Sequence, residues 1–182
     1  MVRPRPLRLS REVALVLVLA ATLAASGTAQ AEGVARLVLV VGNNRPAAAS
    51  QTPLQFADDD AIRFYERFEG LAEDRISLAR FDESSRPYRA IYPEIQPPTK
   101  AAIARAAGAL RARASVLRAQ GRFVELVFVF AGHGGLEGGR PYLALEDGRL
   151  RQGDLESLVL ANDPADLVHV LIDACHSAGL LS

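Results

Sequence analysis

Three largely apolar runs, each ended by glycine or polar residues, constrain the fold of this chain most strongly. They are Leu37–Val41, Phe123–Phe130 and Leu167–Ile172. Continuous runs of this length, without strict alternation of apolar and polar residues, are typical of strands buried on both faces. A further short strand is expected over Ile76–Phe81. The runs therefore predict a mainly parallel sheet with both of its faces covered.

Two amphipathic segments lie between these strands and are predicted to be helices. The first opens at Asp58–Asp60 and carries apolar residues at helical spacing, namely Ile62, Tyr65, Phe68 and Leu71. The second is capped by Thr99 and ends near Gly121. Its apolar face is formed by Ile103, Ala106, Leu110, Ala114 and Leu117. Each helix has one apolar stripe with which to cover the sheet.

The remaining segments are predicted to be connections and small elements. Residues 82–98 contain four prolines and are expected to form a surface loop. Pro141–Leu145 and the turn residues after it indicate a small hairpin or strand pair. Asp154 is expected to cap a short helix that runs to Leu160.

The order of these elements predicts an α/β fold. Strands alternate with helices, and the connections between parallel strands place helices on both faces of the sheet. The expected architecture is a three-layer sandwich with a mainly parallel sheet. The composition agrees with one ordinary domain, because 49% of the 182 residues are apolar and 23% are charged.

The N-terminal segment has the pattern of a signal peptide over residues 1–31. Four arginines precede the uncharged run Val13–Ala25, and Ala29–Ala31 ends in the small-x-small pattern of a cleavage site. The run is too short to span about 30 Å of hydrocarbon, which argues against an uncleaved membrane anchor, the alternative interpretation. The domain then covers residues 32–182. It is expected in the periplasm or outside the cell, without stable membrane insertion after cleavage.

Charge and cysteine content exclude several classes of protein. Lys+Arg and Asp+Glu number 21 each, and removal of the arginine-rich leader leaves the rest slightly acidic. A nucleic-acid partner is therefore not expected. A single cysteine, Cys175, excludes an intrachain disulfide and a cysteine-rich zinc module. A lone thiol in an oxidising compartment is a liability unless it has a use, although an inert buried cysteine is the ordinary alternative.

His133 and Cys175 follow two of the predicted strands within a few residues. Ligands of open α/β sheets bind at the carboxyl ends of the strands, and neighbouring strands lie about 4.8 Å apart. The two side chains can therefore meet over one cleft, where an imidazole would accept the proton of a nucleophilic thiol. Glycines on both sides of His133 allow a sharp turn and leave backbone N–H groups to face an oxyanion.

These two motifs resemble those of the caspase and metacaspase cysteine peptidases. Phe130–Gly134 (Phe-Ala-Gly-His-Gly) and Asp173–Ser177 (Asp-Ala-Cys-His-Ser) match the two catalytic motifs in order. The first strand into Gly42–Asn44 and the pair Asp60-Ala61 match the opening of the same domain. The resemblance spans residues 35–179, and it implies that the family's C-terminal strands would lie beyond Ser182.

The resemblance assigns roles to particular residues. It implies that His133 is the general base and acid, and that Cys175 is the nucleophile. The N–H groups of Gly134 and Cys175 would form the oxyanion hole. Proteins or peptides would be the substrates, and no cofactor is expected, although calcium is known in some family members. The oligomeric state is left open.

Substrate preference is expected from the charges that line the first specificity pocket. Caspases that cleave after Asp have an arginine before the first helix, whereas Leu54–Phe56 contains none. The acids of metacaspase-like enzymes correspond to Asp60 and Asp173, which implies cleavage after Arg or Lys. The alternative is structural: Asp58–Asp60 would complement a helix N-terminus, and Asp173 would hold loop backbone.

Three other interpretations of the same residues remain. The domain could keep the peptidase fold as an inactive binding or regulatory module. Cys175–Gly179 differs by one residue from the Gly-x-Ser-x-Gly elbow of serine esterases, with Ser177 as nucleophile and His133–Gly135 as oxyanion loop. A metal site at Asp173, Cys175 and His176 is disfavoured, because adjacent ligands point apart.

Overall fold

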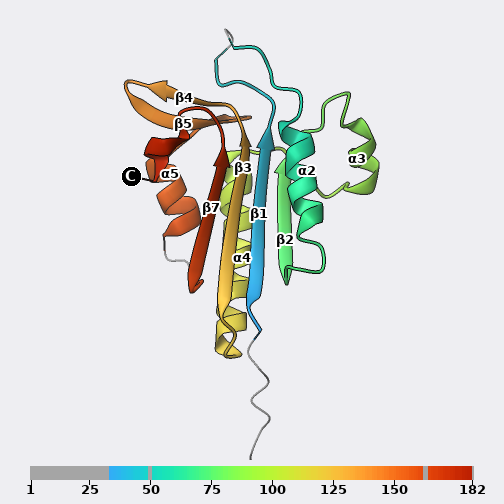
Figure 1. Cartoon of the computed structure of the whole chain (residues 1–182), viewed down its shortest axis with the longest axis vertical. Coiled ribbons are helices and arrows are strands. Elements are labelled where there is room, and N and C mark those ends of the chain that lie inside the picture. The colour runs from blue at the N-terminus through green and yellow to red at the C-terminus, as the bar shows by residue number, and fades with distance from the viewer. Residues whose placement is uncertain (1–32, 49–50, 162–163, 182) are drawn as a thin grey trace, which may run out of the picture. The chain divides into compact units, whose positions relative to one another are not determined.

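A computed structural model describes residues 33–48, 51–161 and 164–181 (Figure 1). The expected signal peptide, residues 1–31, lies outside these ranges. Within them, no helix combines the length and the apolarity that crossing a bilayer requires.

The main sheet has four parallel strands in the order β2-β1-β3-β7, as Figure 1 shows. Its strands are β1 (Ala35–Asn43), β2 (Asp74–Ala79), β3 (Val124–Gly132) and β7 (Leu167–Asp173). The central pair, β1 and β3, is almost wholly buried, as their apolar runs predict. The parallel sheet expected from the sequence is therefore confirmed, and all four strands end at the same edge.

Helices cover the two faces of the sheet, which makes the fold a three-layer α/β sandwich. One face packs against α2 (Ala57–Arg67) and the other against α4 (Lys100–Ala119). The Thr99 hydroxyl caps α4 by accepting a hydrogen bond from the N–H of Ala102 at 3.1 Å. All five residues of the predicted apolar face of α4 are buried.

A second, antiparallel sheet follows β3 and lies at the carboxyl edge of the main sheet (Figure 1). Its three strands are β4 (Gly134–Glu137), β5 (Arg140–Leu145) and β6 (Gly148–Arg151). The sequence predicted only a hairpin or strand pair here. Because β4 begins at Gly134, this sheet anchors the chain directly after His133.

Residues 82–98 are more ordered than the expected loop, because they contain α3 (Arg86–Ile91). Pro87 stands in the first turn of α3, where a missing N–H costs no helical hydrogen bond. The Tyr88 ring lies against Phe81, and the Tyr92 hydroxyl donates to Glu66 at 2.7 Å. The count of prolines was therefore a poor guide to this segment.

Asp154 does not occupy the cap position that the sequence predicted. The short helix α5 (Gln152–Leu155) is preceded by Arg151 as N-cap residue and continues as a π-helical turn, η1 (Glu156–Leu160). The Asp154 carboxylate lies inside the first turn and accepts from the Arg151 N–H at 2.9 Å and from Lys100 Nζ at 2.8 Å. Burial opposes ionisation, but these donors hold the pKa of Asp154 below its ordinary value.

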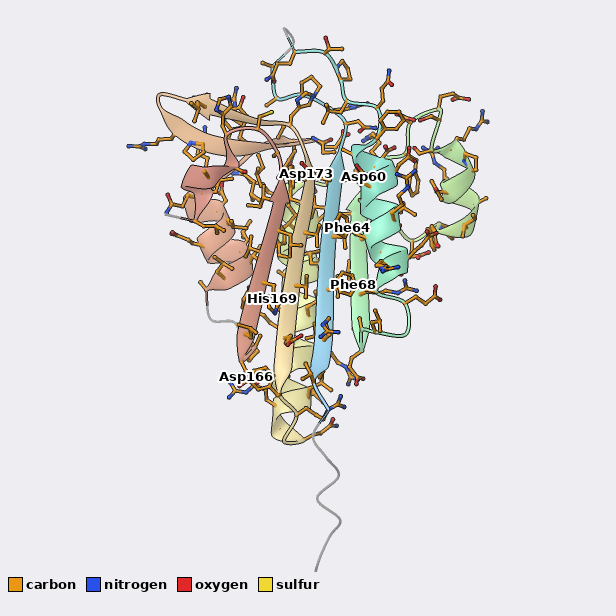
Figure 2. All side chains as sticks on the ribbon, in the orientation of Figure 1. Asp60, Phe64, Phe68, Asp166, His169 and Asp173 are labelled. Atoms are coloured by element: carbon orange, nitrogen blue, oxygen red, sulfur yellow. The ribbon has the colours of Figure 1, made fainter. Side chains whose placement is uncertain are left out.

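The strand β7 is exposed on one face, whereas the sequence predicted a buried strand. Leu167, His169 and Leu171 are exposed on the α2 side of the sheet, and only the alternate residues pack against the α4 side. Figure 2 shows His169 on this open part of β7. In the described ranges, no strand pairs with the outer edge of β7. An apolar run alone cannot report whether neighbours are present.

Candidate active site

The register of β3 and β7 brings the two predicted catalytic loops to the same level. Ala131 pairs with Asp173 in the parallel ladder, and His133 and Cys175 each follow two residues later. A Cβ added to Gly134 would lie 2.0 Å from the Cys175 carbonyl oxygen, so the two loops are in direct contact. The expectation that both loops converge at one sheet edge agrees with this packing.

The His133 ring is held by a backbone carbonyl from a third loop. Its Nε2 lies 3.0 Å from the carbonyl oxygen of Thr52. A carbonyl oxygen can only accept a hydrogen bond, so Nε2 carries the proton in this arrangement. The neutral ring then has its lone pair on Nδ1, which is the atom able to accept a thiol proton. No sequence pattern indicates this contact, because Thr52 takes part through its main chain.

Cys175 is an exposed free thiol followed by a sharp turn. His176 has φ 57° and ψ 23°, a left-handed conformation that costs a residue with a side chain about 1–2 kcal/mol. It is the one non-glycine residue with positive φ in the described ranges. Ser177 then starts the short 3₁₀ helix η2 (Ser177–Leu180). The strained residue is thus His176, whereas the esterase interpretation requires Ser177 at the apex of the turn.

A pocket of about 460 Å³ lies beside Cys175. Asp60 at the start of α2 and Asp173 at the end of β7 both line it. Figure 2 shows these two acids at the same end of the sheet. The structure thus brings three of the predicted site residues to one hollow, whose other lining residues are Leu54, Gln55, Phe56, Ala57, Ala131, Gly132 and Ala174. His133 is outside this lining and adjoins it through Gly132.

Small residues place Asp60 at the sheet edge. A Cβ added to Gly42 would lie 2.3 Å from the Ala57 carbonyl oxygen and 2.5 Å from the Ala61 Cβ. Only glycine at the end of β1 lets the first turn of α2 approach so closely. The Asp60 carboxylate is half-exposed and lies 3.4 Å from the Arg63 guanidinium, a surface contact of small energetic value.

The three consecutive acids of α2 have different environments. Asp58 is fully buried and accepts hydrogen bonds from the Asn44 amide at 2.7 Å and the Ser85 hydroxyl at 2.5 Å. It also accepts from the N–H groups of Asp59 and Asp82. The hydrogen bonds of Asp58 therefore hold the surrounding structure, whereas Asp60 lines the pocket. Burial, and next the charge of Asp58, raise the pKa of Asp59 above its ordinary value.

The two asparagines after β1 join loops at the sheet edge. The Asn43 amide donates to the carbonyl oxygens of Ala144 at 2.8 Å and Arg45 at 2.9 Å. The Asn44 side chain accepts from the Ala57 N–H at 2.8 Å while it donates to Asp58. Both side chains are buried, and they form hydrogen bonds with backbone groups of the loops around the pocket.

One buried carboxylate that the sequence pattern does not reveal also holds this edge. The side chain of Glu146, which is 5% exposed, lies 3.1 Å from Arg45 Nη1 and 2.9 Å from Arg80 Nε. These three residues follow β5, β1 and β2, so the ion pairs tie both sheets together. Glu146 stands in the Glu-Asp-Gly sequence that indicated only the turn of a small hairpin or strand pair.

No group of three or more His, Cys, Asp or Glu side chains in the described ranges is placed to hold a metal ion. The Asp173, Cys175 and His176 triplet, which its spacing disfavours as a ligand set, is not such a group.

The sheet order, the helices on both faces and the paired loops at one edge define a caspase-type α/β domain. The family model described as Caspase domain matches residues 35–181, and the chain belongs to this family of cysteine peptidases. A search of curated proteins found no match. The family predicted from the motifs and the α/β fold predicted from the order of the elements are therefore both confirmed.

Proposed function

We propose that this domain is a cysteine endopeptidase that cleaves after Arg or Lys, with His133 and Cys175 as catalytic residues. The observation that carries the proposal is the pocket beside Cys175, which Asp60 and Asp173 line. Membership of the caspase family supports a peptidase with protein or peptide substrates. The two carboxylates support the preference for a cation.

The proposed reaction starts with transfer of the Cys175 thiol proton to Nδ1 of His133. The sulfur then bonds to the carbonyl carbon of the scissile peptide, and the carbonyl oxygen becomes an oxyanion. In this proposal, the N–H groups of Gly134 and Cys175 donate to that oxygen. The carbon–nitrogen bond then breaks, and the leaving amine takes the proton from His133.

The second half of the reaction frees the enzyme from its thioester. His133 removes a proton from water, the resulting hydroxide attacks the thioester carbon, and the carbon–sulfur bond breaks. The sulfur recovers the proton from His133 when the acid product leaves. In both halves the Thr52 carbonyl keeps the proton on Nε2, which leaves Nδ1 as the nitrogen that exchanges protons with the reacting groups.

The test compares substitutions of the two candidate nucleophiles with three reporter peptides that end in Arg, Lys or Asp. We expect Cys175→Ala to abolish cleavage of the Arg and Lys reporters, and Ser177→Ala to retain most of it. Preference for the Asp reporter would refute the assignment of Asp60 and Asp173. Loss of activity in Ser177→Ala alone would support the esterase interpretation instead.

A thiol-reactive inhibitor separates the peptidase from an inactive binding module. We expect selective labelling of Cys175 in the folded protein, and weaker labelling in His133→Ala because the proton acceptor is gone. A folded protein that is neither labelled nor active would support the binding module. Assays with calcium and with a chelator complete the test, since the proposed steps draw only on protein groups and water.

We also propose that the protein is exported, on the basis of the leader pattern in residues 1–31. N-terminal sequencing of the protein recovered outside the cytoplasm should begin at Glu32. Recovery of a chain that retains Met1 in the cytoplasmic fraction would contradict export.

A further inference from the structure

An exposed aromatic side chain forms part of the wall of the pocket beside Cys175. Phe56 immediately precedes α2 and is 60% exposed, and Leu54, in the same loop, is 38% exposed. Large apolar side chains at the mouth of a pocket are the ones that gain most from contact with a ligand. The pocket therefore combines an apolar wall with the carboxylates of Asp60 and Asp173.

The position of Phe56 is fixed by its backbone and by its neighbours. Its carbonyl oxygen accepts the N–H of Asp60 at 2.8 Å in the first turn of α2. On either side, the N–H groups of Leu54 and Ala57 donate to Asn44, each at 2.8 Å, one to its backbone carbonyl and the other to its side chain. The backbone that carries the Phe56 ring is thus held in place before a substrate arrives, which lowers the entropic cost of ordering this loop on binding.

A pocket with these two kinds of surface distinguishes arginine from lysine. A guanidinium is planar and weakly hydrated, so it can stack on an aromatic face while its N–H groups bind carboxylates. A lysine ammonium is compact and strongly hydrated, and it gains less from the ring. We propose that Phe56 is a specificity-determining residue that makes this pocket prefer Arg to Lys; this inference rests on the proposed function.

The experiment measures kcat/KM for two reporter peptides that differ only in Arg or Lys at the cleaved position. We expect the wild type to favour Arg. Phe56→Leu should lower the Arg-to-Lys ratio about three- to tenfold, the size expected for loss of one cation–π contact. The loss should fall mainly on KM for the Arg reporter, and Phe56→Tyr should restore the ratio because it keeps the aromatic face.

Leu54→Ala is the matched control, since Leu54 lines the same pocket without an aromatic ring. It should weaken both substrates alike and leave their ratio unchanged. Cleavage of Arg and Lys reporters with an unchanged ratio in Phe56→Leu would overturn this inference alone. Failure of the folded wild type to cleave either reporter would overturn the proposed function, and this inference with it.

Discussion

Gly134 shows how the absence of one side chain lets the two loops of the candidate site meet. The Cys175 carbonyl oxygen occupies the space that a Cβ at Gly134 would need. Any larger residue must push the Cys175 loop away from the loop that carries His133. The sequence suggested glycine here for its free N–H and its flexibility, and the structure adds close contact as a further reason.

We predict that Gly134→Ala lowers kcat/KM at least tenfold while the protein stays folded. The methyl group leaves the Gly134 N–H in place, so the loss would come from displacement of Cys175. Gly108→Ala is the control, because a Cβ at residue 108 would meet nothing within 4 Å. In a helix interior such as that of α4, alanine is more favourable than glycine by about 1 kcal/mol. Full activity in Gly134→Ala would show that the loops separate freely.

The first turn of α2 shows that neighbouring residues of one element can have opposite effects on stability. Asp58 satisfies four donors while buried, and Asp59 carries a carboxylate whose ionisation is disfavoured. The carboxylate of Asp58 therefore stabilises the start of α2, whereas ionisation of Asp59 destabilises it.

We predict that Asp58→Asn lowers the free energy of unfolding by about 2 kcal/mol or more, because hydrogen bonds to a buried charge are lost. Asp59→Asn should instead raise it slightly at neutral pH. The raised pKa of Asp59 means that the wild type loses stability as this group ionises, so the gain should shrink as the pH falls through the ordinary Asp pKa of 3.8 and vanish well below it, where Asp59 is protonated in both states. Urea unfolding at several pH values measures both effects, and a destabilised Asp59→Asn at neutral pH would contradict the second.

The sequence predicted elements well where burial and periodicity coincide. The helix α4 has a cap at Thr99, a buried stripe and Gly121, at φ 80°, just beyond its end. The roles of Asp58 and Asp60 could not be separated in this way, because the partner of Asp58 at Ser85 is 27 residues distant. The Thr52 contact was equally hidden, since a backbone carbonyl has no sequence signature.

At the scale of the whole molecule, the main sheet has an exposed edge strand at β7. The face of β7 that carries Leu167 and Leu171 is exposed, and its outer edge has no partner strand in the described ranges. Figure 2 labels His169 on β7, Phe64 on α2 and Phe68 directly after α2. An uncovered edge strand with apolar residues is a site of unwanted pairing between chains.

We predict that this chain associates as its concentration rises, and that Leu171→Lys reduces the association. A charge on the exposed face of an edge strand opposes pairing with a second strand. Ile91→Lys is the control, because Ile91 is 61% exposed on α3, away from β7. Light scattering over a range of concentrations measures the effect, and equal association in both variants would exclude β7 as the contact.

The contact between His133 and Thr52 determines which changes to the chain would free the His133 ring. Because the acceptor is a main-chain atom, exchanging one side chain for another at residue 52 leaves it intact, and an alanine scan would pass over it. Shortening the segment that bears it would withdraw the acceptor and release the imidazole to either tautomer. In the proposed mechanism, the tautomer of His133 thus depends on the length of this loop rather than on any side chain that the loop carries.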